Sequence, residues 1–146
     1  MRNDAIHEHG PRVVAYALIG REEDLLFITD DTGALVLPGG PVPDGEPVEH
    51  ALRRTLRDQI DGTIAGLEFC AVIEHEASKE PPNSLSELAF LFDVTLDDTD
   101  RIAARRPHAH RWAGETDVAL LRPAMIADAL RSGDLSAGAP WRAWTP

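Results

Sequence analysis

The segment from residue 37 to residue 59 carries side chains whose types and spacing could do chemistry. Positions 55, 58 and 59 lie in a stretch with helical periodicity, and residues at i, i+3 and i+4 lie together on one side of a helix. They are Thr55, Asp58 and Gln59. Oxygen-bearing side chains grouped in this way are a candidate site for Mg2+, which prefers oxygen ligands. Since only Asp58 carries a charge, the sequence predicts weak binding of metal by the free protein.

A glycine-rich turn precedes this helix and carries the clearest family signal. Around it the sequence resembles the Nudix box, G-x5-E-x7-R-E-U-x-E-E-x-G-U, in which U is an aliphatic residue. Gly40 and Glu46 stand at its first two fixed positions, Arg54 stands at the arginine, and Leu56 takes the aliphatic place. Together with the order of strands and helices, the resemblance covers nearly the whole chain.

The sequence departs from the box where the family holds its metal. Thr55 replaces the first helix glutamate, Asp58 and Gln59 replace the paired glutamates, and Gly62 comes one residue late. Three carboxylates at these positions let Mg2+ neutralise a diphosphate and activate an attacking water. Because Thr55 and Gln59 offer only neutral oxygens, we expect low activity or an unusual substrate.

The resemblance implies a Nudix-type hydrolase of a nucleoside diphosphate linked to another group. Its cofactor would be Mg2+ or Mn2+, weakly bound or dependent on the substrate. The resemblance also implies that Glu46, Asp58 and Gln59 hold the metal. Arg54 and Asp58 are then the catalytic residues of the helix, with Arg54 orienting a carboxylate through its bidentate fork. The partner is a small phosphate-containing molecule.

A glutamate outside the box is a further candidate. The strand 86–92 resembles the strand on which many family members carry a glutamate that faces the substrate. Glu87 is therefore a candidate catalytic and substrate-binding residue, and an ordinary outward-facing strand glutamate is the alternative. Glu74 and Glu76 lie on one face of the preceding strand, with His75 opposite, and either join Glu87 or are simply solvated.

The glycine turn and a later polar loop supply the remaining predicted substrate contacts. Gly39 and Gly40 are candidates because a turn without side chains lets a ligand approach the backbone. Arg111 is a candidate because the family often presents side chains to the ligand in this region, and His108 and His110 lie beside it. The alternative for this cluster is an exposed loop without a ligand.

Two other functions fit the same residues. A catalytically inactive Nudix-fold module would bind a nucleotide or sugar phosphate through the glycine turn and arginines, without turnover. A purely structural partner subunit would show no ligand-induced shift in melting temperature. A simpler interpretation of the helix is a solvated face on which Arg54 pairs with Asp58, and Arg57 pairs with Asp61, at i, i+4.

The elements that must position these residues follow from hydrophobic periodicity. Val48, Leu52, Leu56 and Ile60 form one stripe, which predicts an amphipathic helix over residues 46–60 that packs on a sheet. Pro47 suits the first helical position, and Glu46 and Glu49 in the first turn complement the positive end of the helix dipole.

Short apolar and β-branched runs bounded by turn residues predict the strands. They cover residues 12–19, 25–28, 34–37, 67–76 and 85–96, with the last two paired as a hairpin, and a short strand or bend at 111–112. The turn at 38–41 is predicted to take the chain out of the sheet. A terminal helix is predicted from Pro123 to the residue before Gly133, and the tail after it, with Trp141 and Trp144, is predicted to fold back onto the body. The resemblance implies an α/β fold, an α/β/α sandwich with a central mixed β-sheet and one helix on each face.

Length and composition limit the class of protein. The 146 residues fit one domain, residues 1–146. A formal net charge of −11 argues against a nucleic-acid polymer as partner, since such binding is built from many Lys and Arg contacts to phosphates. No apolar run is long enough to span a membrane, and the polar N-terminal residues do not resemble a signal peptide, so we expect a cytoplasmic protein. A homodimer is an open expectation because the family often forms one.

Overall fold

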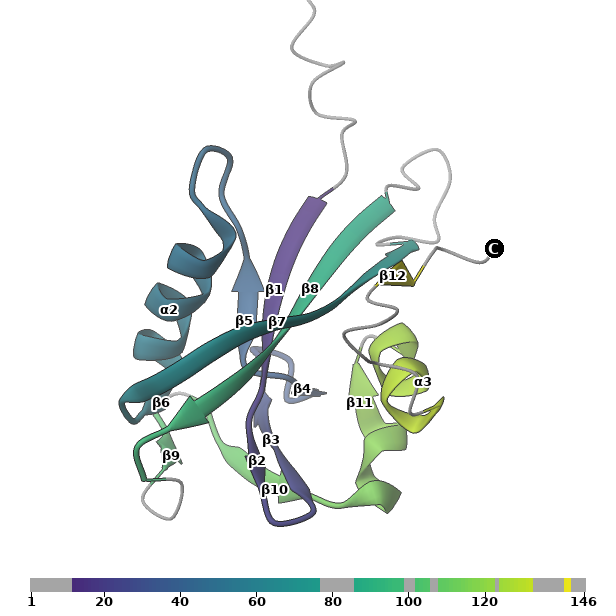
Figure 1. Cartoon of the computed structure of the whole chain (residues 1–146). Helices are drawn as coiled ribbons and strands as arrows, with labels where there is room; N and C mark the ends of the chain where they lie inside the picture. The colour runs from purple at the N-terminus through teal and green to yellow at the C-terminus, as the bar shows by residue number, and fades with distance from the viewer. Residues whose placement is uncertain are drawn as a thin grey trace, which may run out of the picture.

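The computed structural model describes residues 12–76, 86–98, 102–105, 108–122, 124–132 and 141–142. The predicted hairpin tip, Pro123 and Trp144 lie outside these residues. Within the described part, two mixed sheets and two α-helices pack around two apolar clusters (Figure 1). None of the helices in this part is long and apolar enough to cross a membrane.

The larger sheet is mixed and has the order β12-β7-β8-β1-β5. Its strands are β1 (Arg12–Leu18), β5 (Gly39–Pro41), β7 (Ile64–Glu76), β8 (Ser86–Leu96) and β12 (Trp141–Arg142). β1 runs parallel to β8 and antiparallel to β5. β7 and β8 pair antiparallel over their whole length, which confirms the predicted pairing of these two strands. β12 pairs with β7, so this part of the tail does return to the body.

A smaller sheet packs beside it, with the order β10-β3-β4-β11 and β2 paired to β3. Its strands are β2 (Gly20–Arg21), β3 (Asp24–Thr29), β4 (Leu35–Val36), β10 (His110–Ala113) and β11 (Leu121–Arg122). The short pair β6 (Ile60–Asp61) and β9 (Ala103–Ala104) and the 3-10 helix η2 (Glu115–Leu120) complete the described elements other than the α-helices.

The box helix, α2 (Val48–Gln59), forms because its apolar residues share one stripe. Leu52, Leu56 and Ile60 are each at most 2% exposed and pack on one face of the larger sheet, against β1 and β8. The helix begins later than predicted, since Pro47 is its N-cap in extended conformation. Glu46 therefore precedes the helix, and only Glu49 lies in its first turn.

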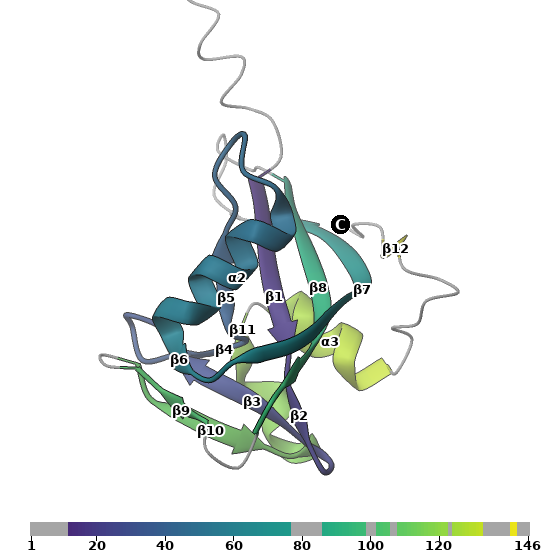
Figure 2. The same cartoon turned by 60° about the vertical axis from the view of Figure 1, so that its left-hand side comes forward.

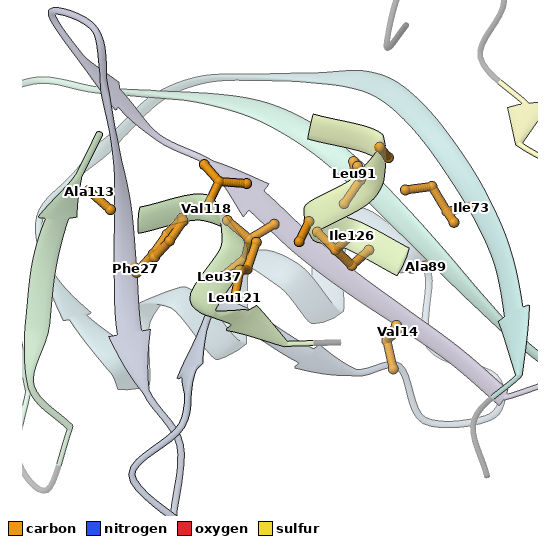
Figure 3. Close-up of a cluster of buried hydrophobic side chains, with 12 residues drawn as sticks. Val14, Phe27, Leu37, Ile73, Ala89, Leu91, Ala113, Val118, Leu121 and Ile126 are labelled. Carbon is orange, nitrogen blue, oxygen red and sulfur yellow. The ribbon is translucent and has the colours of Figure 1, made fainter. Parts of the chain in front are cut away.

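The terminal helix, α3 (Ala124–Ser132), covers the opposite face of the same sheet. Its residues Ile126, Ala127 and Ala129 are buried against β1, β7 and β8 and against the smaller sheet, in the cluster shown in Figure 3. Figures 1 and 2 show the central sheet between α2 and α3. The predicted sandwich is thus confirmed.

The glycine turn does not leave the sheet as predicted, but continues as the edge strand β5. Pro38 O accepts a hydrogen bond from Ala17 N, and Val42 N donates one to Val13 O, both at 2.8 Å. Gly39 pairs with Tyr16 at φ +138°, and a Cβ on Gly39 would lie 2.0 Å from Ala15 O. Only a residue without a side chain lets the two backbones approach this closely.

We expect Gly39→Ala to cost more than about 3 kcal/mol of unfolding free energy, because both its φ and its contact with the β1 backbone reject a Cβ. Gly45→Ala is the matched control, since Gly45 also has a positive φ, +85°, but has nothing within 4 Å. The control should lose about 1–2 kcal/mol. Urea denaturation measures both, and equal losses would show that close packing at Gly39 is unimportant.

Candidate functional site

The side chain of Gln59 holds the glycine turn against the end of α2. Gly39 N donates a hydrogen bond to Gln59 Oε1, and Gln59 Nε2 donates one to Gly39 O, both at 2.8 Å. One helical turn earlier, Thr55 lies against Gly40, where an added Cβ would be 3.6 Å from Thr55 Cγ2. Positions 55 and 59 therefore share the helix side that faces the turn.

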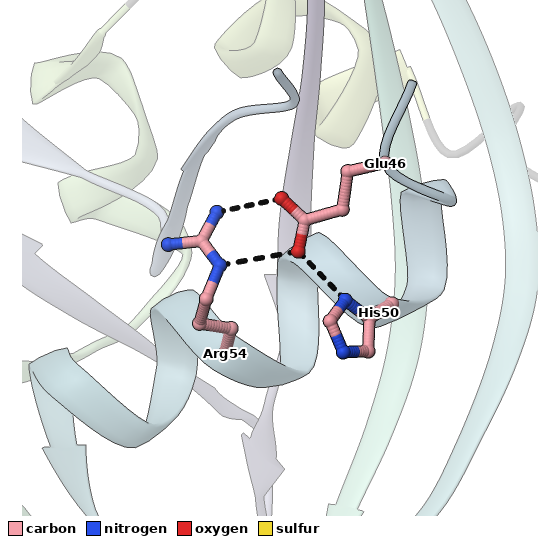
Figure 4. A network of polar contacts seen from close by, with 3 residues as sticks. All are labelled: Glu46, His50 and Arg54. Carbon is pink, nitrogen blue, oxygen red and sulfur yellow. Dashed lines mark hydrogen bonds and ion pairs between the residues drawn. The ribbon is translucent and has the colours of Figure 1, made fainter. Parts of the chain in front are cut away.

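A second polar contact joins the start of α2 to the segment before it (Figure 4). Arg54 donates from Nε to Glu46 Oε2 at 3.1 Å and from Nη2 to Glu46 Oε1 at 3.0 Å. His50 Nδ1 lies 2.7 Å from Glu46 Oε2. These contacts, led by the hydrogen bond from Arg54, hold the pKa of Glu46 below its ordinary value. Glu46, predicted to hold metal, has both carboxylate oxygens bound to side chains of the helix.

Asp58 lies on the exposed side of α2. The pKa of Arg54 is raised first by its hydrogen bonds to Glu46 and more weakly by the charge of Asp58. The Asp58 carboxylate thus lies near Arg54, one helical turn along the helix. It does not line the cleft described next.

A cleft of about 330 Å³ opens beside the glycine turn. β1, β3, β4, β5, the end of α2 and the segment before β10 form its walls. Gly39 and Gly40, both predicted substrate contacts, lie in its lining. Its polar lining residues are Tyr16, Thr29, Asp30, Asp31, Gln59 and His108.

Tyr16, which the sequence analysis did not single out, is part of the lining of this cleft. Burial, and then the negative charge of Glu87, raise its pKa to about 12, against an opposing effect of Arg12. The phenol therefore keeps its proton at neutral pH. The alternation of β1 places Tyr16 with Val14 and Leu18, but only the pairing with β5 shows that this position borders a cleft.

His108 has a defined hydrogen-bonding role in the same cleft. Its Nδ1 lies 2.8 Å from Thr29 O. Because a carbonyl oxygen only accepts, Nδ1 must carry a proton, and Nε2 of the neutral ring is then an acceptor. Asp30 accepts hydrogen bonds from Thr32 and Ala34, and the hydrogen bond from the Thr32 hydroxyl is the main reason that its pKa is lowered.

Glu87 is not in the lining of the cleft. It faces His75 on the neighbouring strand, with Oε1 3.0 Å from His75 Nε2, and the side chains are 10% and 4% exposed. By strand alternation it shares a face with Ala89 and Leu91, which pack on the α3 side of the sheet. Positions 55, 58 and 59 are on the α2 side. The structure therefore does not bring Glu87 to them.

Two other predicted neighbours are also placed apart. Glu74 is opposite Leu88 in the β7–β8 register, so His75 and not Glu74 shares the face of Glu87. Arg111 lies on β10, where its Nη2 is 2.6 Å from Asp117 Oδ1, and it is not part of the cleft lining. Of the polar loop before Trp112, His108 is the residue that reaches the cleft.

The residues at the box positions do not fit a resident divalent metal ion. The amide oxygen of Gln59 already accepts the Gly39 N–H, and Gln59 Nε2 directs a positive hydrogen at Gly39 O. Glu46 is engaged by Arg54, which leaves Asp58 as the one carboxylate of the set. Throughout the described residues, no three His, Cys, Asp or Glu side chains are close enough together to hold a metal.

We expect Gln59→Glu to lose about 1–3 kcal/mol of unfolding free energy at neutral pH, because a carboxylate would face Gly39 O without a proton to donate. The protonated acid can donate, so the pKa of the new carboxyl is raised in the folded protein. The stability of the Gln59→Glu variant is then greatest at low pH. It is lost as pH rises above the pKa of the carboxyl in the unfolded protein, about 4.3.

Gln59→Met is the control for this experiment. It removes the same two hydrogen bonds without adding a charge, so its loss should not depend on pH in this range. Urea denaturation across pH 4 to 8 separates the two variants. A Gln59→Glu protein as stable as the wild type at all pH values would show that the amide does not hold the turn.

We expect Glu87→Gln to lower the pKa of Tyr16 below about 12, since it removes the charge that raises this pKa. Tyr16 is the sole tyrosine of the chain, so the ultraviolet titration of tyrosinate reports it alone. The exposed Glu68→Gln on β7 is the control and should leave the titration unchanged. Glu87→Gln should also lower the free energy of unfolding, because the Glu87 pair with His75 is buried. An unchanged stability together with weaker ligand binding would instead support the ligand role predicted from sequence.

Solved structures resemble this fold over most of their length. A MutT protein from Methanosarcina mazei Go1 matches with a TM-score of 0.67 and 19% identity, covering 87% of this chain and 95% of that chain. A MutT Nudix hydrolase from Burkholderia pseudomallei has a TM-score of 0.60 and 25% identity, covering 80% and 95%. The dihydroneopterin triphosphate pyrophosphohydrolase of E. coli has a TM-score of 0.66 and 17% identity, covering 84% and 96%.

No family model and no curated protein matches the sequence. The fold comparison nevertheless points one way. The similar solved structures include several named as Nudix or MutT proteins and one named as a pyrophosphohydrolase. In this chain the glycine turn and Glu46 precede α2, and Arg54 lies within it. This protein therefore has the fold of the Nudix hydrolase superfamily.

Proposed function

We propose that this protein is a Nudix-type hydrolase with weak turnover, and that its cleft binds a nucleoside diphosphate linked to another group. The observation that carries the proposal is the cleft itself, which opens at the glycine turn where α2 ends. Two polar residues, Tyr16 and His108, line it together with Gly39 and Gly40. Most ligand sites combine an apolar wall with a few such polar groups.

The charges of the cleft decide which end of the ligand enters it. Its lining includes Asp30 and Asp31 and, within the described residues, no Lys or Arg. An anionic diphosphate is repelled by two carboxylates, whereas the amino groups of a nucleobase can donate to them. We therefore place the base in the cleft and the diphosphate at its mouth, towards the glycine turn.

Hydrolysis of the diphosphate needs an attacking water and a base that accepts its proton. Asp58 is the one box carboxylate that is not hydrogen-bonded to Arg54, and it lies near that guanidinium. Glu46 and Arg54 fix each other and the start of α2. A lone, exposed aspartate is a weak substitute for a full carboxylate set, which is why we propose weak turnover.

The similar structures support a diphosphate-bond substrate as a class. One of them is a dihydroneopterin triphosphate pyrophosphohydrolase, whose substrate joins a heterocycle to a chain of phosphates. A heterocycle in the cleft and phosphates at its mouth would follow the same arrangement. The identity of the group beyond the diphosphate stays open in this proposal.

Binding without turnover is a second candidate, and the Gln59 contact favours it. The amide holds the glycine turn in place with two hydrogen bonds, so the cleft is shaped in the protein without a bound cation. A ligand could then be recognised by Tyr16, His108 and the turn with no chemistry following. The two candidates predict the same binding and differ only in product formation.

A panel of nucleoside diphosphate derivatives tests the proposal by melting temperature and by the release of nucleoside monophosphate, the product of diphosphate-bond cleavage, with Mg2+ or Mn2+. We expect at least one ligand to raise the melting temperature, with slow release that Asp58→Asn abolishes. A shift without release would establish the second candidate. A panel with neither a shift nor release would overturn the proposal and favour a structural partner subunit.

The double variant Thr55→Glu with Gln59→Glu is the matched gain-of-function test. Restored carboxylates should increase metal affinity, and a restored base or ligand contributes on the order of 10²- to 10⁴-fold in rate. The metal-free variant should be less stable than the wild type, because it also loses the Gln59 contact with Gly39, and Mg2+ should recover part of the loss. A folded double variant with unchanged metal affinity would contradict the alignment of α2 to the box.

A further inference from the structure

A second cavity, of about 350 Å³, lies at α2 and the loop that follows it. It shares no residue with the cleft, so the two cavities are separate features joined by one helix. Its lining comes from α2, from β6 and from the segment 62–64. The lining residues are Arg53, Leu56, Arg57, Ile60, Gly62, Thr63 and Ile64.

Two arginines give this cavity a concentrated positive charge. Arg53 and Arg57 are four residues apart on α2, so their guanidinium groups lie one helical turn apart on one side. Both are exposed, and neither forms an ion pair with any residue that the structure describes. By contrast, Arg54 binds Glu46 and Arg105 contacts Asp61.

Two like charges at i, i+4 repel each other, and this repulsion destabilises a helix. The protein has 25 acidic residues against 14 lysines and arginines, yet none of the described acidic residues forms an ion pair with Arg53 or Arg57. Two arginines without an acidic partner beside a cavity suit the binding of an anion, because guanidinium groups match the oxygens of phosphate and carboxylate.

The floor of the cavity is apolar. Leu56 and Ile60 are only 1% and 2% exposed, and Ile64 is partly buried beside them. An anion that carries an apolar body would place its charge on the arginines and its own apolar surface against this floor, where that surface is removed from water.

We propose that this cavity is a second ligand site, and that it binds an organic phosphate monoester with a small aromatic or aliphatic body. Two guanidinium groups match the two negative charges of a phosphate monoester better than the single charge of a carboxylate. The volume is at the low end of the range for small-molecule sites, about 300–1,000 Å³, so the body is small. This site is independent of any nucleotide in the cleft.

Calorimetric titration with phenyl phosphate, benzoate and inorganic phosphate tests the proposal on the full chain at low salt. We expect phenyl phosphate to bind more tightly than either of the other two, and its affinity to fall as salt is added. Arg53→Gln and Arg57→Gln should each weaken it about 10-fold, since each removes one charged hydrogen-bond donor to the phosphate.

Arg122→Gln is the matched control, because Arg122 is also exposed but lies on β11, away from the cavity lining. It should change the affinity less than about 2-fold, which is the size of a general charge effect. Tyr16→Phe should also leave the affinity unchanged, which separates this site from the cleft. An equal loss in Arg122→Gln, no binding of phenyl phosphate, or equal affinity for inorganic phosphate would each overturn the proposal.

Discussion

The close approach of Gly39 to β1 is the contact on which the arrangement of the cleft depends. It allows β5 to pair with β1 as an edge strand, and this pairing carries the chain from the smaller sheet to the start of α2. Gln59 then binds the same glycine from the far end of the helix. One residue without a side chain thus fixes a strand edge, a helix end and one wall of the cleft.

The two ends of α2 are held in different ways. At its start, Glu46 binds Arg54 and His50, so the segment before the helix is tied to its first turns. At its end, the contact is an amide on a backbone, which is neutral and needs no counterion. In the Nudix box the corresponding position is a glutamate, and a carboxylate beside a carbonyl oxygen needs a cation between them. In this chain the hydrogens of an amide take that place.

The sequence predicted the local elements well because they depend on local periodicity. The stripe of Leu52, Leu56 and Ile60 determines the buried side of α2, and the apolar runs of β7 and β8 determine that these strands pair. The predicted start of α2 was too early, because the N-cap and the first helical position are adjacent and proline fits both. These errors are small.

The larger errors concern contacts between distant parts of the chain. Glu87 was predicted to face the substrate, and the structure places it against His75 on the α3 side of the sheet. The face on which a strand residue lies depends on the register with its partners, and a shift of one residue reverses it. Tyr16 and His108 both line the cleft although they are far apart in the sequence. Nothing in the sequence around either residue shows that the two share a cleft. The Gln59 contact was also missed, because a glutamine is compatible with a metal site and with a backbone contact alike.

The position of β1 between β5 and β8 also affects how the chain can fold as it is synthesised. β1 comprises residues 12–18, and its parallel partner β8 aligns residues 87–93 with it. While the ribosome is still producing the middle of the chain, β5 is the one described neighbour in the larger sheet that can already pair with β1. Such long sequence separations slow folding, because loop closure must precede the contacts that stabilise it. One edge of the first described strand therefore stays without its partner until residues 87–93 have left the ribosome.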